Sequence, residues 1–83
     1  MNYQLYSRVA LAEDLPERRL RRGDVAVVVE HHPGRPDQEP GYSLELFNAL
    51  GETIDVVTVR ESQIKPLAAD ELLSVRPLPA ITR

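Results

Sequence analysis

The chain has 83 residues, which is the size of one small domain. Its 13 acidic and 10 basic residues give a net charge of −3, which is neither the basic footprint of a nucleic-acid binder nor acidic enough to indicate disorder. The absence of cysteine excludes disulfides and thiolate metal sites and is typical of a cytoplasmic protein. No signal-peptide pattern opens the sequence, and no apolar run approaches the ~20 residues of a membrane helix. These features predict a cytoplasmic protein that does not contact a membrane.

The first expected element is a short strand over Arg8–Leu11, where apolar residues alternate weakly. A long loop over Ala12–Arg22 follows, with one helical turn for which Asp14 is the expected N-cap. We expect Leu15 and Leu20 to fold back onto the body of the domain, since they are the large apolar residues of this loop.

Three further strands are expected in the middle of the chain. Val25–Val29 and Glu52–Val59 are rich in β-branched residues, which suit a pleated sheet better than a helix. Tyr42–Phe47 alternates between apolar and polar residues, and the short Asn48–Gly51 loop predicts that it pairs with Glu52–Val59 as a hairpin. The segment Glu30–Gly41 holds three prolines and two glycines, so it is expected to be an irregular loop.

The last expected strand is Ile64–Leu67, where Pro66 has no N–H and therefore belongs at a sheet edge or a strand end. Five short strands with few helical signals predict a small all-β barrel or sandwich formed by residues 1–67. Residues 68–83 form a C-terminal tail that is either irregular or contains a short helix over Ala68–Val75, which Pro77 and Pro79 prevent from continuing.

The sequence also resembles a known group of domains. Leu20, two arginines, Gly23-Asp24 and a valine-rich strand resemble the opening of the KOW-like and SH3-like small barrels. Over roughly Tyr6 to Leu67, the chain resembles a family of small bacterial domains of unknown function. The resemblance implies a five-stranded SH3-like barrel without catalytic residues. Some members look like partners in toxin–antitoxin or toxin–immunity gene pairs, which implies protein binding.

The sequence offers little that is typical of catalysis or cofactor binding. None of its serines lies in a nucleophile-elbow motif, and its adjacent carboxylates are not placed in a predicted cleft. His31 and His32 are neighbours in an extended segment, so their side chains point apart, and with Asp37 and Glu39 they fit a polar surface loop better than a metal site. We therefore expect no enzyme activity, no cofactor and no bound metal.

Four arginines in one loop form a candidate anion-binding site: Arg18, Arg19, Arg21 and Arg22. Arginine pairs well with phosphates and with carboxylates of a protein partner, so nucleic-acid binding by a KOW-like module is the alternative function. Carboxylates in the same region balance much of this charge, and only three tyrosines and one phenylalanine are available for base stacking. Nucleic acid is therefore the less favoured partner.

An excess of apolar residues is the strongest indication of binding. Tyr42, Leu44 and Leu46 take the core face of their strand, which places Phe47 on the opposite face. We expect Val57 and Val59 to share this second face with Phe47. The tail residues Leu72, Leu73 and Val75 either cover it or join it in binding a partner. The sequence thus predicts a non-catalytic protein-interaction module that binds a partner protein, of antitoxin or immunity type by resemblance, or a second copy of itself.

Overall fold

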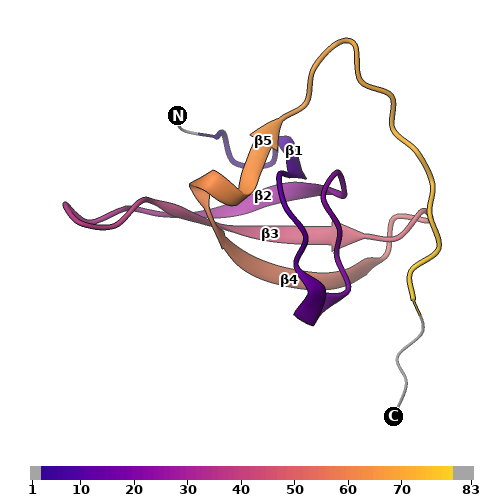
Figure 1. Cartoon of the computed structure of the whole chain (residues 1–83), viewed down its shortest axis with the longest axis horizontal. Coiled ribbons are helices and arrows are strands. Elements are labelled where there is room, and N and C mark those ends of the chain that lie inside the picture. The colour runs from indigo at the N-terminus through magenta and orange to yellow at the C-terminus, as the bar shows by residue number, and fades with distance from the viewer. Residues whose placement is uncertain (1–2, 80–83) are drawn as a thin grey trace.

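Five short antiparallel strands make up almost all the regular structure in the computed structural model, which describes residues 3–79 (Figure 1). The strands are β1 (Arg8–Leu11), β2 (Val25–His32), β3 (Gly41–Phe47), β4 (Thr53–Arg60) and β5 (Ile64–Pro66). Two single-turn 3₁₀ helices, η1 (Pro16–Arg18) and η2 (Glu61–Gln63), are the only helices within residues 3–79. No helix in that range is long and apolar enough to cross a membrane. The prediction of an all-β fold with five strands is confirmed.

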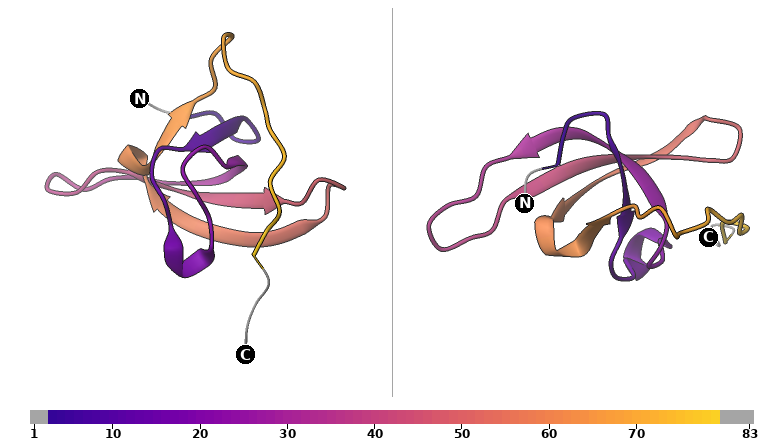
Figure 2. Two further views of the ribbon diagram at one scale, coloured as in Figure 1. Left: turned by 45° about the vertical axis from the view of Figure 1, so that its right-hand side comes forward. Right: turned by 90° about the horizontal axis from the view of Figure 1, so that it is seen from above.

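The strands form one sheet in the order β4-β3-β2-β1-β5. β1 to β4 follow one another as neighbours, and β5 returns to pair with the free side of β1, with Ile64 opposite Leu11. Figures 1 and 2 show that the sheet curls, so that β1 and β5 lie above β2, β3 and β4. The expected hairpin is also present, because Asn48 Oδ1 accepts hydrogen bonds from the N–H groups of Leu50 and Glu52 in the loop between β3 and β4.

One face of the curled sheet forms the core. Leu15 and Leu20 from the loop after β1 are buried against it, as predicted, and their backbones bond to each other. The turn η1 between them begins after Leu15, which makes no side-chain cap, so the prediction of Asp14 as N-cap is wrong. Asp14 Oδ1 instead accepts the N–H of Arg22 at 2.8 Å, which fastens the two arms of the loop together.

The predicted exposed face of β4 is wrong. Val57 and Val59 lie in the core, each only 4% exposed. Val57 pairs with Leu44 and Val59 with Tyr42, and residues directly opposite in an antiparallel ladder share one face. The sequence alone does not fix this register, and the pattern of β4 by itself therefore predicts the wrong exposed face.

The opposite set of β4 residues is exposed instead. The register shifts by one residue after Leu46, because Leu46 pairs with Asp55 whereas Phe47 pairs with Thr53. This β-bulge leaves Ile54 as an extra residue on the β4 side. Ile54 and Val56 therefore lie outside the core, with 40% and 51% of their surfaces exposed.

β2 extends further than predicted. It continues to His32, so the loop between β2 and β3 covers residues 33–40 rather than starting at Glu30. A register shift between Val28 and Glu30 accommodates one extra residue in β2. The β-branched run explains the start of the strand, but pairing with β3 carries it through the polar residues that follow.

The two edge strands both limit further pairing. In β4, the Val56 N–H donates to Asp55 Oδ1 at 2.9 Å and the Arg60 N–H donates to Gln63 Oε1 at 2.8 Å. β5 is the other edge, in agreement with the position expected for Pro66, which has no N–H to offer. Side chains and a proline thus occupy places where another strand would bond.

The tail contains no helix within its described part, residues 68–79. Its one backbone–backbone hydrogen bond there joins the Glu71 N–H to the Ala68 C=O, which makes a single turn. The expected helix over Ala68–Val75 is therefore absent, and the irregular form is the one observed. Two turns of helix form too few hydrogen bonds to be stable without packing. The tail instead leaves β5, loops away from the sheet and runs down past the end of β3 (Figure 1).

The burial of β4 generates a direct test. We expect Val57→Ala to lower the free energy of unfolding by about 1–3 kcal/mol, since it removes two buried methyl groups and leaves a cavity. Val56→Ala, on the exposed side of the same strand, should change it by less than about 0.5 kcal/mol. Urea unfolding of the two variants measures both values. Equal effects would contradict the register described here.

Candidate interaction surface

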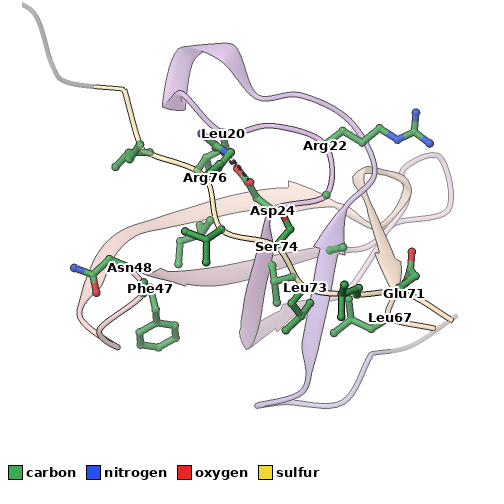
Figure 3. A pocket seen from close by; sticks show the side chains of 18 of the residues that line it. Leu20, Arg22, Asp24, Phe47, Asn48, Leu67, Glu71, Leu73, Ser74 and Arg76 are labelled. Carbon is green, nitrogen blue, oxygen red and sulfur yellow. Dashed lines mark hydrogen bonds and ion pairs between the residues drawn. The ribbon is translucent and has the colours of Figure 1, made fainter. Parts of the chain in front are cut away.

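An open groove of about 840 Å³ lies between the tail and the end of the sheet where β2 begins and β3 ends (Figure 3). We call its two walls the body side, formed by Val25, Phe47 and Ile54, and the tail side, formed by Leu72, Leu73 and Val75. Charged residues from both sides also line it: Arg22, Asp24, Lys65, Glu71 and Arg76. Its volume falls in the range of roughly 300–1,000 Å³ found for small-molecule pockets.

The body side of the groove presents part of the apolar face that the sequence predicted. Phe47 is 40% exposed, as expected for a residue opposite the core face. Ile54 lies beside it where Val57 and Val59 were expected, so the surface consists of Phe47 and Ile54, with Val56 further along β4. The excess of apolar residues is real, but the β-bulge determines which residues supply it.

The tail side carries the three tail residues singled out from the sequence. Leu72 and Val75 are 93% and 88% exposed, and Leu73 is about half exposed. These side chains line the groove without filling it, so they cover little of the sheet. Together with the body side they leave two apolar walls that face the same open space.

One ion pair fastens the tail to the body. Arg76 Nε donates to Asp24 Oδ1 at 2.9 Å, and Arg76 Nη2 donates to Asp24 Oδ2, which makes a two-pronged contact (Figure 3). Asp24 Oδ2 also accepts the Arg21 N–H at 2.8 Å, and Arg76 Nη2 approaches the Arg19 C=O at 3.3 Å. The Arg76 and Asp24 side chains are only 25% and 19% exposed, so this pair is shielded better than the other ion pairs within residues 3–79.

A second ion pair holds the beginning of the tail. Lys65 Nζ donates to Glu71 Oε2, and Glu71 Oε1 accepts the Ala68 N–H at 2.7 Å. Holding a residue in one conformation costs roughly 1–2 kcal/mol, while an exposed ion pair contributes only about 0.2–1 kcal/mol. The position of the tail therefore depends strongly on the shielded contact between Arg76 and Asp24.

The four arginines of the cluster make different contacts. The Arg18 guanidinium pairs with Asp55 of β4 at 3.3 Å. Arg19 adopts a left-handed backbone conformation that ends η1, and Arg21 and Arg22 donate their N–H groups to Asp24 and Asp14. Carboxylates thus organise the loop, in line with the balanced charge seen in the sequence.

The two histidines lie in β2 and have different surroundings. The His31 ring stacks on Tyr42 with the ring centres 5.1 Å apart, whereas His32 Nε2 lies 2.8 Å from Ser43 Oγ. Within residues 3–79, no three histidine, aspartate or glutamate side chains come together as a candidate metal site.

Ser43 and His32 are the nearest approach to a nucleophile and a base. Glu30 Oε1 is 3.9 Å from the same His32 Nε2 that faces Ser43, so it does not orient the ring through the other nitrogen, as a catalytic triad would require. Neither Ser43 nor His32 lines the groove. The contact has the form of an interstrand polar bond, which Ser43 extends toward Thr58 at 3.3 Å.

Sequence reasoning missed the pairing of Asp24 with Arg76. The two residues are 52 positions apart, and in the sequence Asp24 stands out only as part of the Gly23-Asp24 pair before the valine-rich strand. Arg76 lies in a tail with no regular structure, so no periodicity marks it. The available signal was weak: Arg76 is the one charged residue between the apolar tail residues and Pro77.

The comparisons with known proteins identify a family. A family described as "Domain of unknown function (DUF4926)" matches residues 5–66, which is well over half of the chain, and the chain belongs to this family. No curated protein and no solved structure matches the chain. The match ends at the last residue of β5, so the tail lies outside the matched region, as the resemblance predicted.

The ion pair predicts how Asp24 titrates. Partial burial by itself would raise the pKa of the Asp24 carboxyl, but the hydrogen bonds and charge of Arg76, together with the Arg21 N–H, outweigh it and hold the pKa below its ordinary value. Ionised Asp24 therefore stabilises the fold above the ordinary carboxyl pKa, and this stabilisation is lost as the pH falls through the lowered value.

We expect Arg76→Gln to raise the pKa of Asp24 back toward the ordinary range, since the cation that favours the ionised form is gone. Carboxyl carbon chemical shifts followed by NMR over pH 2–6 measure this. Arg35→Gln, in the loop between β2 and β3, is the control and should leave the titration of Asp24 unchanged. An unchanged titration in Arg76→Gln would show that the ion pair does not form in solution.

Proposed function

We propose that this member of the DUF4926 family is a non-catalytic protein-interaction module that binds a partner protein through the two apolar walls of the groove. The observation that carries the proposal is the exposure of Phe47 and Ile54 on the body side opposite Leu72, Leu73 and Val75 on the tail side. Contiguous exposed apolar side chains on a small domain are typical of an interface, whereas single exposed apolar residues scattered over a surface are normal.

The composition of the groove supports a protein partner in particular. Its walls are apolar and its charged residues are already paired for the most part, Arg76 with Asp24 and Lys65 with Glu71. An apolar centre with a polar rim is the usual arrangement at protein interfaces. Phe47 is the candidate anchor, since buried aromatic side chains contribute much of the energy at such interfaces.

The alternative function, nucleic-acid binding through Arg18, Arg19, Arg21 and Arg22, has less support. A phosphate-binding surface needs cations that are free to face the backbone of the nucleic acid. Here Arg18 is paired with Asp55, and the carboxylates of Asp14 and Asp24 lie within the same loop. These contacts favour a structural role for the loop between β1 and β2, which also holds the tail through Asp24.

Three more specific parts of the proposal concern the fold type, the partner and the location of the protein. The strand order, with β5 beside β1 at the end of a four-stranded meander, supports the SH3-like interpretation. The resemblance to domains from toxin–antitoxin or toxin–immunity gene pairs favours a toxin encoded by a neighbouring gene as the partner. The cysteine-free sequence supports a cytoplasmic location.

The proposal predicts which substitutions weaken binding. Phe47→Ser and Ile54→Ser should each weaken the complex with the product of the adjacent gene by about tenfold or more, as expected for central interface residues. Leu50→Ser is the matched control, since Leu50 is apolar and 86% exposed but does not line the groove. Size-exclusion chromatography and calorimetry of the purified pair measure the affinity.

Sedimentation of the chain alone distinguishes the second possible partner, another copy of itself, and the same three variants apply to that dimer. The proposal is wrong if the chain neither self-associates nor binds the neighbouring product. It is also wrong if Leu50→Ser weakens the complex as much as Phe47→Ser does.

A further inference from the structure

The tail is attached to the body in a different way from every strand. Within residues 68–79, no backbone hydrogen bond reaches the sheet, and the one backbone bond present lies inside the tail itself. The ion pairs that reach the body from this segment are Lys65 with Glu71 at the start and Asp24 with Arg76 further on. Charge rather than strand pairing holds the tail in place.

Apolar burial contributes little to this attachment. The segment between Glu71 and Arg76 carries Leu72, Leu73 and Val75, which are half to almost fully exposed. An open groove lies beneath it, so these side chains are not seated on the sheet. Two ion pairs hold this segment, and the apolar residues between them stay exposed. Docking of the tail therefore contributes little free energy, as is typical of segments that open locally.

Asp24 is well suited to receive the tail. Its carboxylate is already fixed by the Arg21 N–H in the turn before β2, so it presents both oxygens without rearrangement. Arg76 meets it with two nitrogens, a geometry that arginine and carboxylate favour. The acceptor belongs to the rigid body, and the donor belongs to the segment that has no other backbone support.

We propose that the ion pair between Asp24 and Arg76 is a latch, and that its release frees the tail and opens the groove on the body side. The latched tail forms the wall that faces Phe47 and Ile54, and its release separates the two walls so that a partner can reach the residues of both. A partner that binds the open form more tightly shifts the equilibrium toward release. The latch itself is independent of any partner, whereas its effect on binding rests on the proposed function.

The test follows the tail directly. The chain has no cysteine, so Ser74→Cys introduces a single site for a nitroxide spin label in the tail. In the latched form, the label should broaden the amide NMR signals of Gly23, Asp24 and Val25. Adding Arg76→Gln should reduce this broadening, because losing an ion pair of roughly 1 kcal/mol lowers the ratio of latched to released tail about fivefold.

Two companion variants make the test specific. Asp24→Asn keeps an oxygen that accepts the Arg21 N–H but removes the charge, and it should reduce the broadening as Arg76→Gln does. Arg35→Gln removes a cation from the loop between β2 and β3 and should leave the broadening unchanged. Retained broadening in Arg76→Gln or in Asp24→Asn, or its absence in the chain with an intact latch, would overturn the proposal.

Binding measurements separate this proposal from the proposed function. With the product of the adjacent gene, Arg76→Gln should tighten the complex, since less energy is needed to open the groove. If release is observed but the affinity is unchanged or lower, the latch does not control the groove. If neither form binds any partner, the proposed function fails while the broadening experiment still decides whether the latch exists.

Discussion

A curled sheet of five short strands encloses one interior, and this limit determines most of the structure. Side chains alternate between two faces along each strand, so only one set can be buried. In β4 the buried set is Val57 and Val59, because their partners Tyr42 and Leu44 already face the core. The chain nevertheless carries apolar residues on both faces, and those left outside, such as Val56, have no interior to enter.

Because the interior is this small, the strands and the C-terminal tail are held in place by different interactions. The strands are held by backbone ladders and by a shared core, to which Leu15 and Leu20 contribute from the first loop. Within residues 68–79 the tail has neither, and it depends on ion pairs with side chains on the surface of the body. The first loop links the two systems, because Asp24 at its end receives Arg76 while its leucines anchor the loop itself.

Local patterns in the sequence were sufficient for much of the fold. The β-branched runs indicate β2 and β4, and the alternation of apolar and polar residues indicates β3. The turn-forming residues around Asn48 predict that β3 and β4 pair as a hairpin. These signals work because strand propensity and turn geometry depend on nearby residues. The length of β2 was underestimated, since pairing with β3 extends it through His31 and His32, which have no strong local preference for a strand.

The errors arose where structure depends on distant residues. The bulge after Leu46 changes which β4 residues are exposed, and nothing in the local pattern specifies it. Phe47 was therefore assigned correctly to the surface while Val57 and Val59 were not. The contact between Asp24 and Arg76 joins residues 52 positions apart and has no local signature at all.

The treatment of the sheet edges has a consequence for how recognition can evolve in this domain. Because Asp55 and Gln63 cap backbone N–H groups of β4, and Pro66 ends β5, a visiting strand finds few main-chain groups to join. Under the proposed function, recognition would depend on side chains, whose identity can change by single mutations without disturbing the ladder. The scaffold can then retain its architecture while those side chains change, and the same capped edges hinder strand pairing between copies.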